Sequence, residues 1–238
     1  MITDPLQVER IARNIDISLE ELAAMIDHTK LKPHETRESI GKLCEEAKKY
    51  GFAAVYVHPI WVSFAKQRLK NTDIMVGTVV GFPLGSTLSK IKEFEAKAEL
   101  EEGADELDMV INIGALREGN YQLVEEDIRR VVEVAKEYGA IVKVILEVGY
   151  LTDEQIIKAC NIAKKAGANF VKTATGFGPM GATIHHVKIM RETVGSDMGV
   201  KAAGGIRTYE QAISMIEAGA TRIGTSSGVN IVLGAPEG

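Results

Sequence analysis

The chain has 238 residues, 45% of them hydrophobic and 26% charged, which is enough to bury a large core as one α/β domain or two small ones. A formal net charge of −5 excludes a protein whose main partner is nucleic acid, because no basic stripe could neutralise a phosphate backbone. Residues 1–10 lack an apolar signal-peptide core, and no apolar run is long enough to cross a membrane, so we expect a cytoplasmic protein with no membrane partner.

The first predicted element is an N-terminal helical extension over residues 1–20. It opens with Asp4-Pro5 and has an apolar side, and Ser18 and Glu21 form a capping-box pattern at the start of a short helix. We assign residues 21–238 to a single barrel domain. The extension would cover the bottom of this domain or contact another subunit, and the sequence leaves both open.

Eight apolar strands follow in chain order, separated by amphipathic helices. Most strands start within a few residues of a glycine, which suits the end of a helix because the next residue commonly takes φ > 0. These glycines are Gly51, Gly103, Gly139, Gly167, Gly199 and Gly219. The predicted strands are residues 24–31, 52–57, 73–82, 106–112, 141–147, 169–173, 199–205 and 221–225.

The strands recur at spacings of roughly 20 to 36 residues, with helical stripes between them. One stripe, Ile91, Phe94 and Ala98, is interpreted as packing of a helix against the sheet. Eight βα units in about 250 residues predict a closed (β/α)8 TIM barrel, since a doubly wound sheet would normally need fewer strands or a second domain.

Charged side chains are predicted inside this barrel. Side chains alternate along a strand, so every second residue points into the barrel interior. In residues 106–112 the apolar set Leu107, Met109 and Ile111 faces the helices, which sends Asp108 inward. The same alternation places these side chains inside: Asp27, Tyr56, Lys143, Glu147, Lys172 and Lys201.

Lysines in such a place point to amine chemistry. Burial and a neighbouring cation both disfavour the charged form, so Lys172 or Lys201 can present a neutral amine near pH 7. One lysine would attack a carbonyl as a Schiff-base nucleophile, the other would lower its pKa, and Asp108 would serve in general acid–base catalysis. The alternation does not decide which lysine has which role. The alternative is an inert cluster of compensated charges.

Six motifs resemble those of the deoxyribose-phosphate aldolase family: IDHTKLKP, VVGFPLG, GADELDMVINIGAL, FVKTATGFG, MGVKAAGGIRT and RIGTSSG. They cover about residues 20–232 in the family's order. The resemblance implies a class I aldolase on a (β/α)8 barrel that needs no metal or cofactor. It further implies reversible cleavage of 2-deoxy-D-ribose 5-phosphate to D-glyceraldehyde 3-phosphate and acetaldehyde, as part of deoxynucleotide catabolism.

The resemblance also assigns roles to residues. Lys172 would form the Schiff base, Lys201 would lower its pKa, and Asp108 would shuttle protons. The other implied site residues are Asp27 and Thr29, near a sugar hydroxyl or its water network, and Lys143, near Asp108.

A phosphate site is expected beyond the last strands, because barrels often bind phosphate with the loops after strands seven and eight. Gly204 and Gly205 follow strand seven and permit close backbone approach. Ser226 and Ser227 follow strand eight and precede a short predicted helix, whose N-terminal amides favour an anion. Thr175 and Gly176 end strand six and would complete the site.

Two residues depart from the family pattern. Phe177 stands where some members carry a basic residue, so backbone amides and serines would have to hold the phosphate. Tyr56 stands where many relatives carry cysteine, which changes the pocket wall.

Other features favour no additional chemistry. The five histidines lack the spacing of a metal site, and Cys44 and Cys160 lie on apolar helical stripes. We therefore expect no metal site. We also expect a homo-oligomer, either a dimer or a tetramer, whose partners are small molecules, a phosphorylated sugar and an aldehyde. The alternative functions are a phosphosugar isomerase, a Schiff-base aldolase for keto acids or ketose phosphates, or a catalytically silent barrel that serves as an interaction module.

Overall fold

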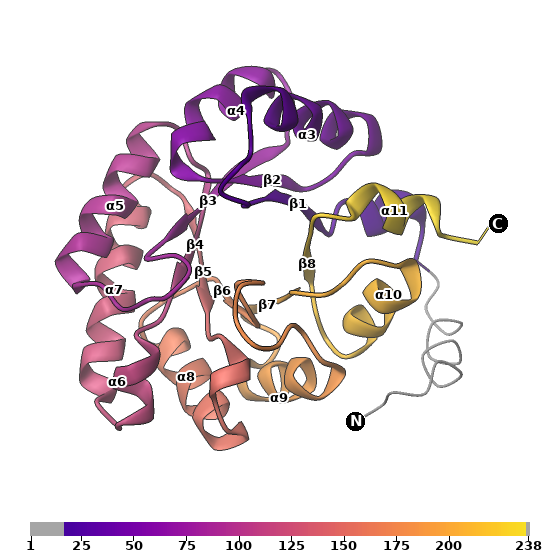
Figure 1. The fold of residues 1–238 in the computed structure, drawn as a ribbon. Coiled ribbons are helices and arrows are strands. Elements are labelled where there is room, and N and C mark those ends of the chain that lie inside the picture. Colours follow the sequence, from indigo (N-terminus) through magenta and orange to yellow (C-terminus); the bar gives the residue numbers. More distant parts are fainter. Residues whose placement is uncertain (1–16, 237–238) are drawn as a thin grey trace.

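Eight parallel strands close into one barrel, in which each strand pairs with its sequence neighbours and β8 pairs with β1 (Figure 1). The computed structural model describes residues 17–236. The predicted (β/α)8 TIM barrel is confirmed. Its strands are β1 (Ile26–Lys30), β2 (Ala54–Val57), β3 (Met75–Val80), β4 (Glu106–Val110), β5 (Ile141–Ile145), β6 (Phe170–Lys172), β7 (Gly199–Ala203) and β8 (Arg222–Thr225).

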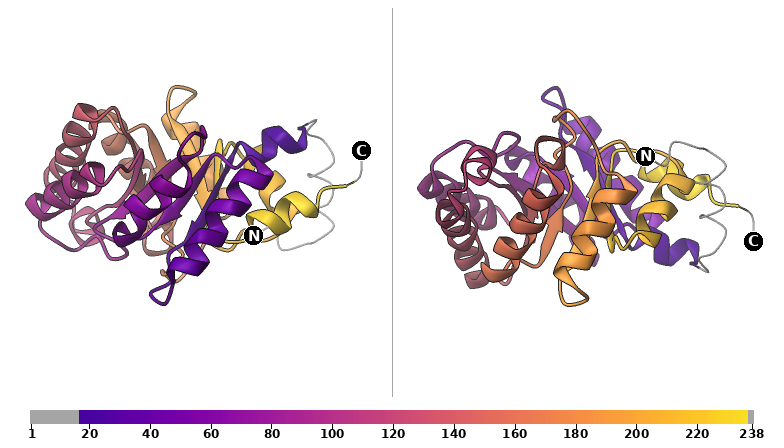
Figure 2. Two further views of the ribbon diagram at one scale, coloured as in Figure 1. Left: turned by 90° about the horizontal axis from the view of Figure 1, so that it is seen from above. Right: turned by 90° about the horizontal axis from the view of Figure 1, so that it is seen from below.

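Helices surround the strands, as the views from above and below show (Figure 2). They are α2 (Leu19–Ala23), α3 (Arg37–Tyr50), α4 (Val62–Arg68), α5 (Ser89–Glu101), α6 (Ile113–Arg117), α7 (Tyr121–Glu137), α8 (Asp153–Lys165), α9 (Ile184–Val194), α10 (Tyr209–Glu217) and α11 (Gly228–Leu233). Two short 3-10 helices, η1 (Pro59–Trp61) and η2 (Val148–Tyr150), follow β2 and β5. Within residues 17–236 none of the helices has the length and apolar character of a membrane span.

The N-terminal extension is described only from residue 17 onward, and residues 1–16 lie outside the described part of the chain. The capping box is confirmed: the Ser18 hydroxyl accepts a hydrogen bond from the Glu21 amide, and the Glu21 carboxylate accepts one from the Ser18 amide. These bonds satisfy two amides at the start of α2 that would otherwise lack a partner. The division between extension and barrel domain at residues 20 and 21 stays a prediction.

Five of the six glycines predicted at helix ends take a positive φ, and Gly199 does not. Helix α9 ends at Val194 and is capped by Gly195 (φ 72°), and Gly199 is the first residue of β7. A glycine is required there for a different reason. The Phe170 ring on the neighbouring strand β6 occupies the space in which a side chain at position 199 would lie.

Helix α5 is rotated differently from the prediction. Ile91 and Phe94 are 45% and 71% exposed, so the interpretation of Ile91, Phe94 and Ala98 as packing against the sheet is wrong. The side of α5 that faces the barrel carries Lys92, which is fully buried. Its ammonium pairs with Asp127 on α7 and donates a hydrogen bond to the Val110 carbonyl at the end of β4. This buried ion pair sets the rotation of α5 and turns the apolar stripe outward.

Part of the barrel interior is filled by Tyr56 on β2. Its ring lies across from Gly77, its register partner on β3, and a Cβ atom at position 77 would overlap the ring. The tyrosine hydroxyl donates a 2.7 Å hydrogen bond to Glu106 on β4. Because the ring is fully buried and held at its far end, it has no room to move away.

We predict that Gly77→Ala lowers the free energy of unfolding by ~1–3 kcal/mol, because the added methyl group overpacks the interior against Tyr56. Urea denaturation followed by circular dichroism measures this change. Gly114→Ala is the control, since its Cβ atom would lie 3.6 Å from the nearest atom, in ordinary contact, and alanine favours helix α6. Equal stability of the two variants would contradict the overlap.

Candidate active site

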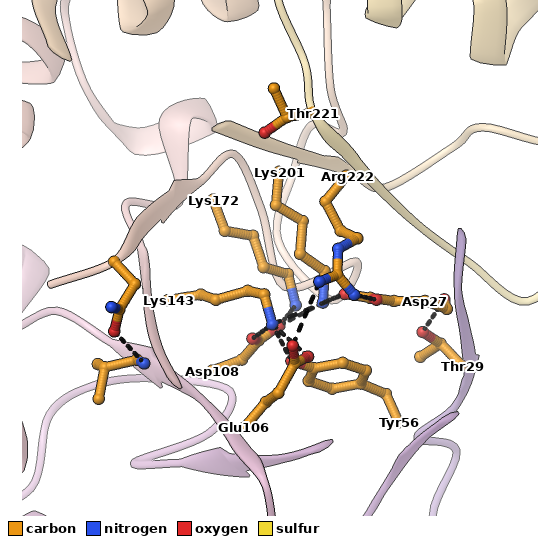
Figure 3. Close-up of polar contacts among 12 residues, drawn as sticks. Asp27, Thr29, Tyr56, Glu106, Asp108, Lys143, Lys172, Lys201, Thr221 and Arg222 are labelled. Carbon is orange, nitrogen blue, oxygen red and sulfur yellow. Dashed lines mark hydrogen bonds and ion pairs between the residues drawn. The ribbon is translucent and has the colours of Figure 1, made fainter. Parts of the chain in front are cut away.

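Three predicted residues meet in the barrel interior. Lys172 on β6 and Lys201 on β7 are register partners and lie side by side. Their ammonium nitrogens are 2.7 Å and 2.8 Å from the same oxygen, Oδ2 of Asp108 on β4 (Figure 3). None of the three side chains is more than 5% exposed. One carboxylate therefore joins two amines in a site that excludes bulk water.

Asp27 on β1 extends this cluster toward the barrel seam. Its Oδ2 lies 2.6 Å from Nζ of Lys201, and its Oδ1 accepts a 2.7 Å hydrogen bond from the Arg222 guanidinium on β8. Thr29, two residues further along β1, donates its hydroxyl to the Asp27 carbonyl oxygen at 2.9 Å. Lys201 thus sits between two carboxylates, whereas Lys172 is hydrogen-bonded to one.

Lys143 on β5 lies deeper in the same interior (Figure 3). Its ammonium pairs with Glu106, lies 2.6 Å from the Tyr56 hydroxyl, and is 4.0 Å from the nearest oxygens of Asp27 and Asp108. The predicted position near Asp108 is therefore observed, and the direct partner of Lys143 is Glu106.

Two charged residues of the cluster are absent from the sequence-based set, Glu106 and Arg222. Glu106 has the same strand parity as Asp108, so the alternation already indicates that it points inward. Glu147, in contrast, does not join the lysines. It follows the end of β5 with a φ of +56°, and its carboxylate binds the hydroxyl and amide of Thr175.

The electrostatics of the cluster favour loss of a proton from Lys172. Burial lowers its pKa to about 8, and Lys201 acts in the same direction against the opposing effect of Asp108. Burial also disfavours the charge on Lys201, but Asp108 and Asp27 outweigh it and raise the pKa of Lys201. Burial opposes ionisation of Asp108, yet Lys172, Lys201 and Lys143 hold its pKa below the usual range. Of the two lysines, Lys172 therefore loses its proton more readily.

A cavity of about 460 Å³ opens above Lys172 at the carboxyl ends of the strands. Its wall includes the predicted residues Thr29, Thr175, Gly176, Gly204, Gly205 and Ser226. Ser227 is not part of the wall, and its amide donates to the Thr225 hydroxyl. The structure therefore brings the amine and most of the predicted anion-binding residues to one cavity.

Backbone amides supply the free donors of this cavity. Within residues 17–236, the amides of Gly176, Gly204, Gly205 and Ser226 donate no hydrogen bond. The Thr175 amide and hydroxyl are already engaged by Glu147. Gly204 and Gly205 have φ values of 96° and 83°, which only glycine adopts without strain and which turn the chain around the cavity.

Three further cations line the cavity, Lys30, Lys32 and Arg207, and none of them belongs to the sequence-based set. The Lys32 ammonium lies 4.6 Å from the centre of the Phe177 ring, within the range of a cation–π interaction. A positive charge therefore stands over the position at which some family members are expected to carry a basic residue. It comes from the β1–α3 loop, which sequence spacing alone does not connect with Phe177.

One group of possible metal ligands lies outside the cavity wall. Among residues 17–236, Asp153, His185 and His186 place their ligand atoms within 4.8 Å of one another. His185 is exposed, and its Nε2 lies 2.8 Å from Asp153. These residues sit in the first turns of α8 and α9, where the positive ends of the helix dipoles oppose a cation.

Comparison with known proteins agrees with the geometry. A sequence model of the DeoC/LacD family aldolases matches residues 22–234. The chain belongs to this family. As a DeoC/LacD family aldolase, it carries the lysine pair and Asp108 inside the barrel that the family model covers.

Two relatives and one solved structure illustrate the match. The deoxyribose-phosphate aldolase of Thermococcus kodakarensis is 63% identical over 91% of this chain and 98% of that protein. The one from Streptococcus sanguinis is 58% identical over 90% of this chain and 96% of that protein. The tetrameric deoxyribose phosphate aldolase structure from Aeropyrum pernix is 34% identical, covers 97% of both chains and has a TM-score of 0.88.

We predict that Arg222→Met lowers the free energy of unfolding by ~1–3 kcal/mol, because one buried oxygen of Asp27 and one of Glu106 lose the guanidinium that donates to them. Arg129→Met is the control, since Arg129 forms an exposed pair with Glu133 and should cost less than ~1 kcal/mol. Urea denaturation measures both values. A loss at Arg222 as small as that at Arg129 would show that the charge is not needed there.

Proposed function

We propose that the protein is a class I aldolase that cleaves 2-deoxy-D-ribose 5-phosphate reversibly to D-glyceraldehyde 3-phosphate and acetaldehyde. The proposal rests on one observation above all: the Lys172 amine lies at the floor of a cavity and shares the Asp108 carboxylate with a second lysine. The names of the relatives support the substrate.

Lys172 begins the reaction as a neutral amine that attacks C1 of the open-chain sugar. The carbinolamine formed loses water and becomes a protonated imine, which has a positively charged nitrogen bonded to C1. Asp108 bonds both lysines, so it can relay the protons of these steps. Lys201 has a raised pKa and stays charged, which keeps the neutral form on Lys172.

The carbon–carbon bond breaks next. Removal of the proton from the C3 hydroxyl lets the electrons of the C2–C3 bond move toward the imine nitrogen. D-glyceraldehyde 3-phosphate leaves, and an enamine of acetaldehyde remains on Lys172. Protonation at C2 and hydrolysis then release acetaldehyde and the free amine. Asp27 and Thr29 lie on β1, and the Asp27 carboxylate contacts the Lys201 amine. These two residues would position the C3 hydroxyl of the sugar or a water molecule.

The phosphate would bind at the cavity wall formed by the loops after β6, β7 and β8. The free amides of Gly176, Gly204, Gly205 and Ser226 suit an anion, whereas Ser227 lies outside the cavity wall and is not part of the proposed phosphate site. Lys32 and Arg207 add positive charge. Thr175 would act by shaping the loop, because Glu147 holds its polar groups. Lys143 does not line the cavity and would act indirectly, because its ammonium balances the negative charge of Asp108.

The cellular setting is part of the same proposal. Both cysteines are free and buried, which fits a reducing cytoplasm. The tetrameric structure of the Aeropyrum pernix relative supports a homo-oligomer. An isomerase would bind a similar phosphosugar but would form no imine with a lysine.

Borohydride trapping tests the assignment of Lys172. With acetaldehyde and borohydride, we expect an N-ethyl group on the peptide that contains Lys172, located by mass spectrometry. Lys172→Ala should lose both the adduct and, by ~10³-fold or more, the turnover. Lys158→Ala, which removes an exposed lysine on α8, should keep both. An adduct on Lys201 would exchange the two roles, and turnover without any adduct would favour the isomerase.

The pH dependence of kcat/KM tests the role of Lys201. Because the attacking amine must be neutral, kcat/KM should fall about tenfold for each pH unit below 8. Lys201→Met removes a cation that lowers the pKa of Lys172, so this limb should move to higher pH. Lys201→Arg keeps the charge and should leave the limb in place. An unmoved limb in Lys201→Met would contradict the proposed effect of Lys201.

A further inference from the structure

Glu147 has an unusual backbone conformation directly after the bonded end of β5. Among residues 17–236 it is one of two residues other than glycine with a positive φ, and its φ is 56°. The other is Asn71, and asparagine adopts this conformation more readily than glutamate does. Such a conformation persists only where the surrounding structure holds it, and it often marks a functional position. Glu147 nevertheless does not line the cavity around Lys172.

The main chain on both sides of Glu147 is bonded to the strand that carries Lys172. The Leu146 amide donates a 2.9 Å hydrogen bond to the Lys172 carbonyl oxygen, and the Val148 amide donates a 3.0 Å bond to that of Thr173. In a regular parallel pair, a step of two residues on one strand matches two on the other. Here it matches one, so Glu147 is the extra residue of a bulge, which redirects a side chain.

The redirected side chain of Glu147 holds the turn that follows β6. Glu147 is 1% exposed, and its Oε2 accepts hydrogen bonds from both the hydroxyl and the amide of Thr175. The Thr175 hydroxyl in turn accepts a 3.0 Å bond from the Phe177 amide. The main chain of Gly178 lies against the same carboxyl group, so that a Cβ atom there would come within 2.7 Å of it. The turn at residues 175–178 is therefore wrapped around one carboxyl group.

These bonds leave one amide of the turn for a ligand. The Thr175 and Phe177 amides are bonded within the protein, whereas the amide of Gly176, which lines the cavity, donates no hydrogen bond among residues 17–236. The far end of the same loop is also fixed, because the Ala182 amide donates a 3.0 Å bond to the Gly204 carbonyl oxygen. The loop is thus held at both ends with the Gly176 amide free.

We propose that Glu147 is a positioning residue that sets the preference for phosphorylated substrates. It fixes the Gly176 amide relative to the Lys172 amine, so that a bound phosphate brings the other end of the same molecule to the amine. Glu147 itself lines a second pocket of about 340 Å³, on the other side of residues 175–177, and does not contact a substrate in the cavity. The inference rests on the proposed function, because it takes a phosphosugar as the substrate.

The proposed role depends on the acceptor oxygen of Glu147 and not on its charge. A negative charge near the cavity repels a phosphate group, so a purely electrostatic role predicts tighter phosphate binding when the charge is removed. Loss of the acceptor would instead release Thr175 and weaken phosphate binding. The two roles therefore predict opposite results for a neutral side chain that accepts no hydrogen bond.

Steady-state kinetics with 2-deoxy-D-ribose 5-phosphate and with 2-deoxy-D-ribose test the role. Glu147→Leu accepts no hydrogen bond, so KM for the phosphorylated sugar should rise about tenfold while kcat stays within about twofold. Glu147→Gln keeps an acceptor oxygen, so its KM should stay within about threefold of the wild-type value. For the unphosphorylated sugar, kcat/KM should be unchanged in both variants. Glu137→Leu makes the same change at an exposed position on α7 and serves as the control.

Equal losses for the two sugars in Glu147→Leu would overturn the role, because they would show a general effect on folding or chemistry. An unchanged KM in this variant would overturn it as well. Borohydride trapping with acetaldehyde, which needs no phosphate, should still label Lys172 in Glu147→Leu and so show that the amine site is intact.

Inorganic phosphate gives a readout that needs no turnover. By isothermal titration calorimetry, its dissociation constant should rise about tenfold in Glu147→Leu and stay near the wild-type value in Glu147→Gln. Tighter binding in both variants would show the purely electrostatic effect instead, and a wild-type protein without phosphate affinity would overturn the role. A wild-type protein that binds phosphate but cleaves neither sugar would contradict the proposed function alone, and the titration would still decide the role of Glu147.

A double-variant cycle tests the bond between Glu147 and Thr175. Thr175→Val keeps the shape of the side chain but loses the hydroxyl that joins Glu147 to the Phe177 amide. It should also raise KM for the phosphorylated sugar about tenfold, and Glu147→Leu/Thr175→Val should raise it no further, because both changes remove the same link. If the two factors multiply, the residues act independently and the proposed link fails.

Discussion

The bond of one buried carboxylate, Asp108, to two ammonium groups is the interaction on which the site depends. It holds Lys172 and Lys201 at hydrogen-bond distance from a common oxygen, although their charges repel. Without the carboxylate, two lysines on neighbouring strands would have to separate or lose their protons. The barrel makes the arrangement possible because three different strands, β4, β6 and β7, each send one side chain to the same point of the interior.

The surrounding charges decide which lysine is basic. Four cationic side chains meet three carboxylates in the interior, so the cluster has one positive charge more than it can compensate (Figure 3). Lys201 binds two carboxylates and Lys143 binds Glu106, whereas Lys172 lies at the cavity end and is hydrogen-bonded to Asp108. Loss of a proton from Lys172, the amine that faces the cavity, therefore relieves the excess positive charge. The same set of charges holds the cluster together and makes Lys172 the lysine that becomes neutral.

Strand alternation predicts much of this site, because a strand shows which residues share a face. It correctly placed Asp108, Lys143, Lys172 and Lys201 inside the barrel. It does not reveal partners between distant strands, so the pairs of Glu106 with Lys143 and Arg222 with Asp27 required the structure. The outward turn of α5 was missed for the same reason. An apolar stripe normally faces the core, but the buried pair of Lys92 and Asp127 outweighs that preference.

The contact between Asp27 and Arg222 joins residues 195 positions apart, the first strand and the last. During synthesis at about 5–20 residues per second, the ribosome makes β8 on the order of 10–40 s after β1. Until then the nascent sheet has two open edges, at β1 and β7, and the carboxylate of Asp27 lacks its guanidinium. The barrel closes only when β8 pairs with β1, so nearly the whole chain must be synthesised before closure.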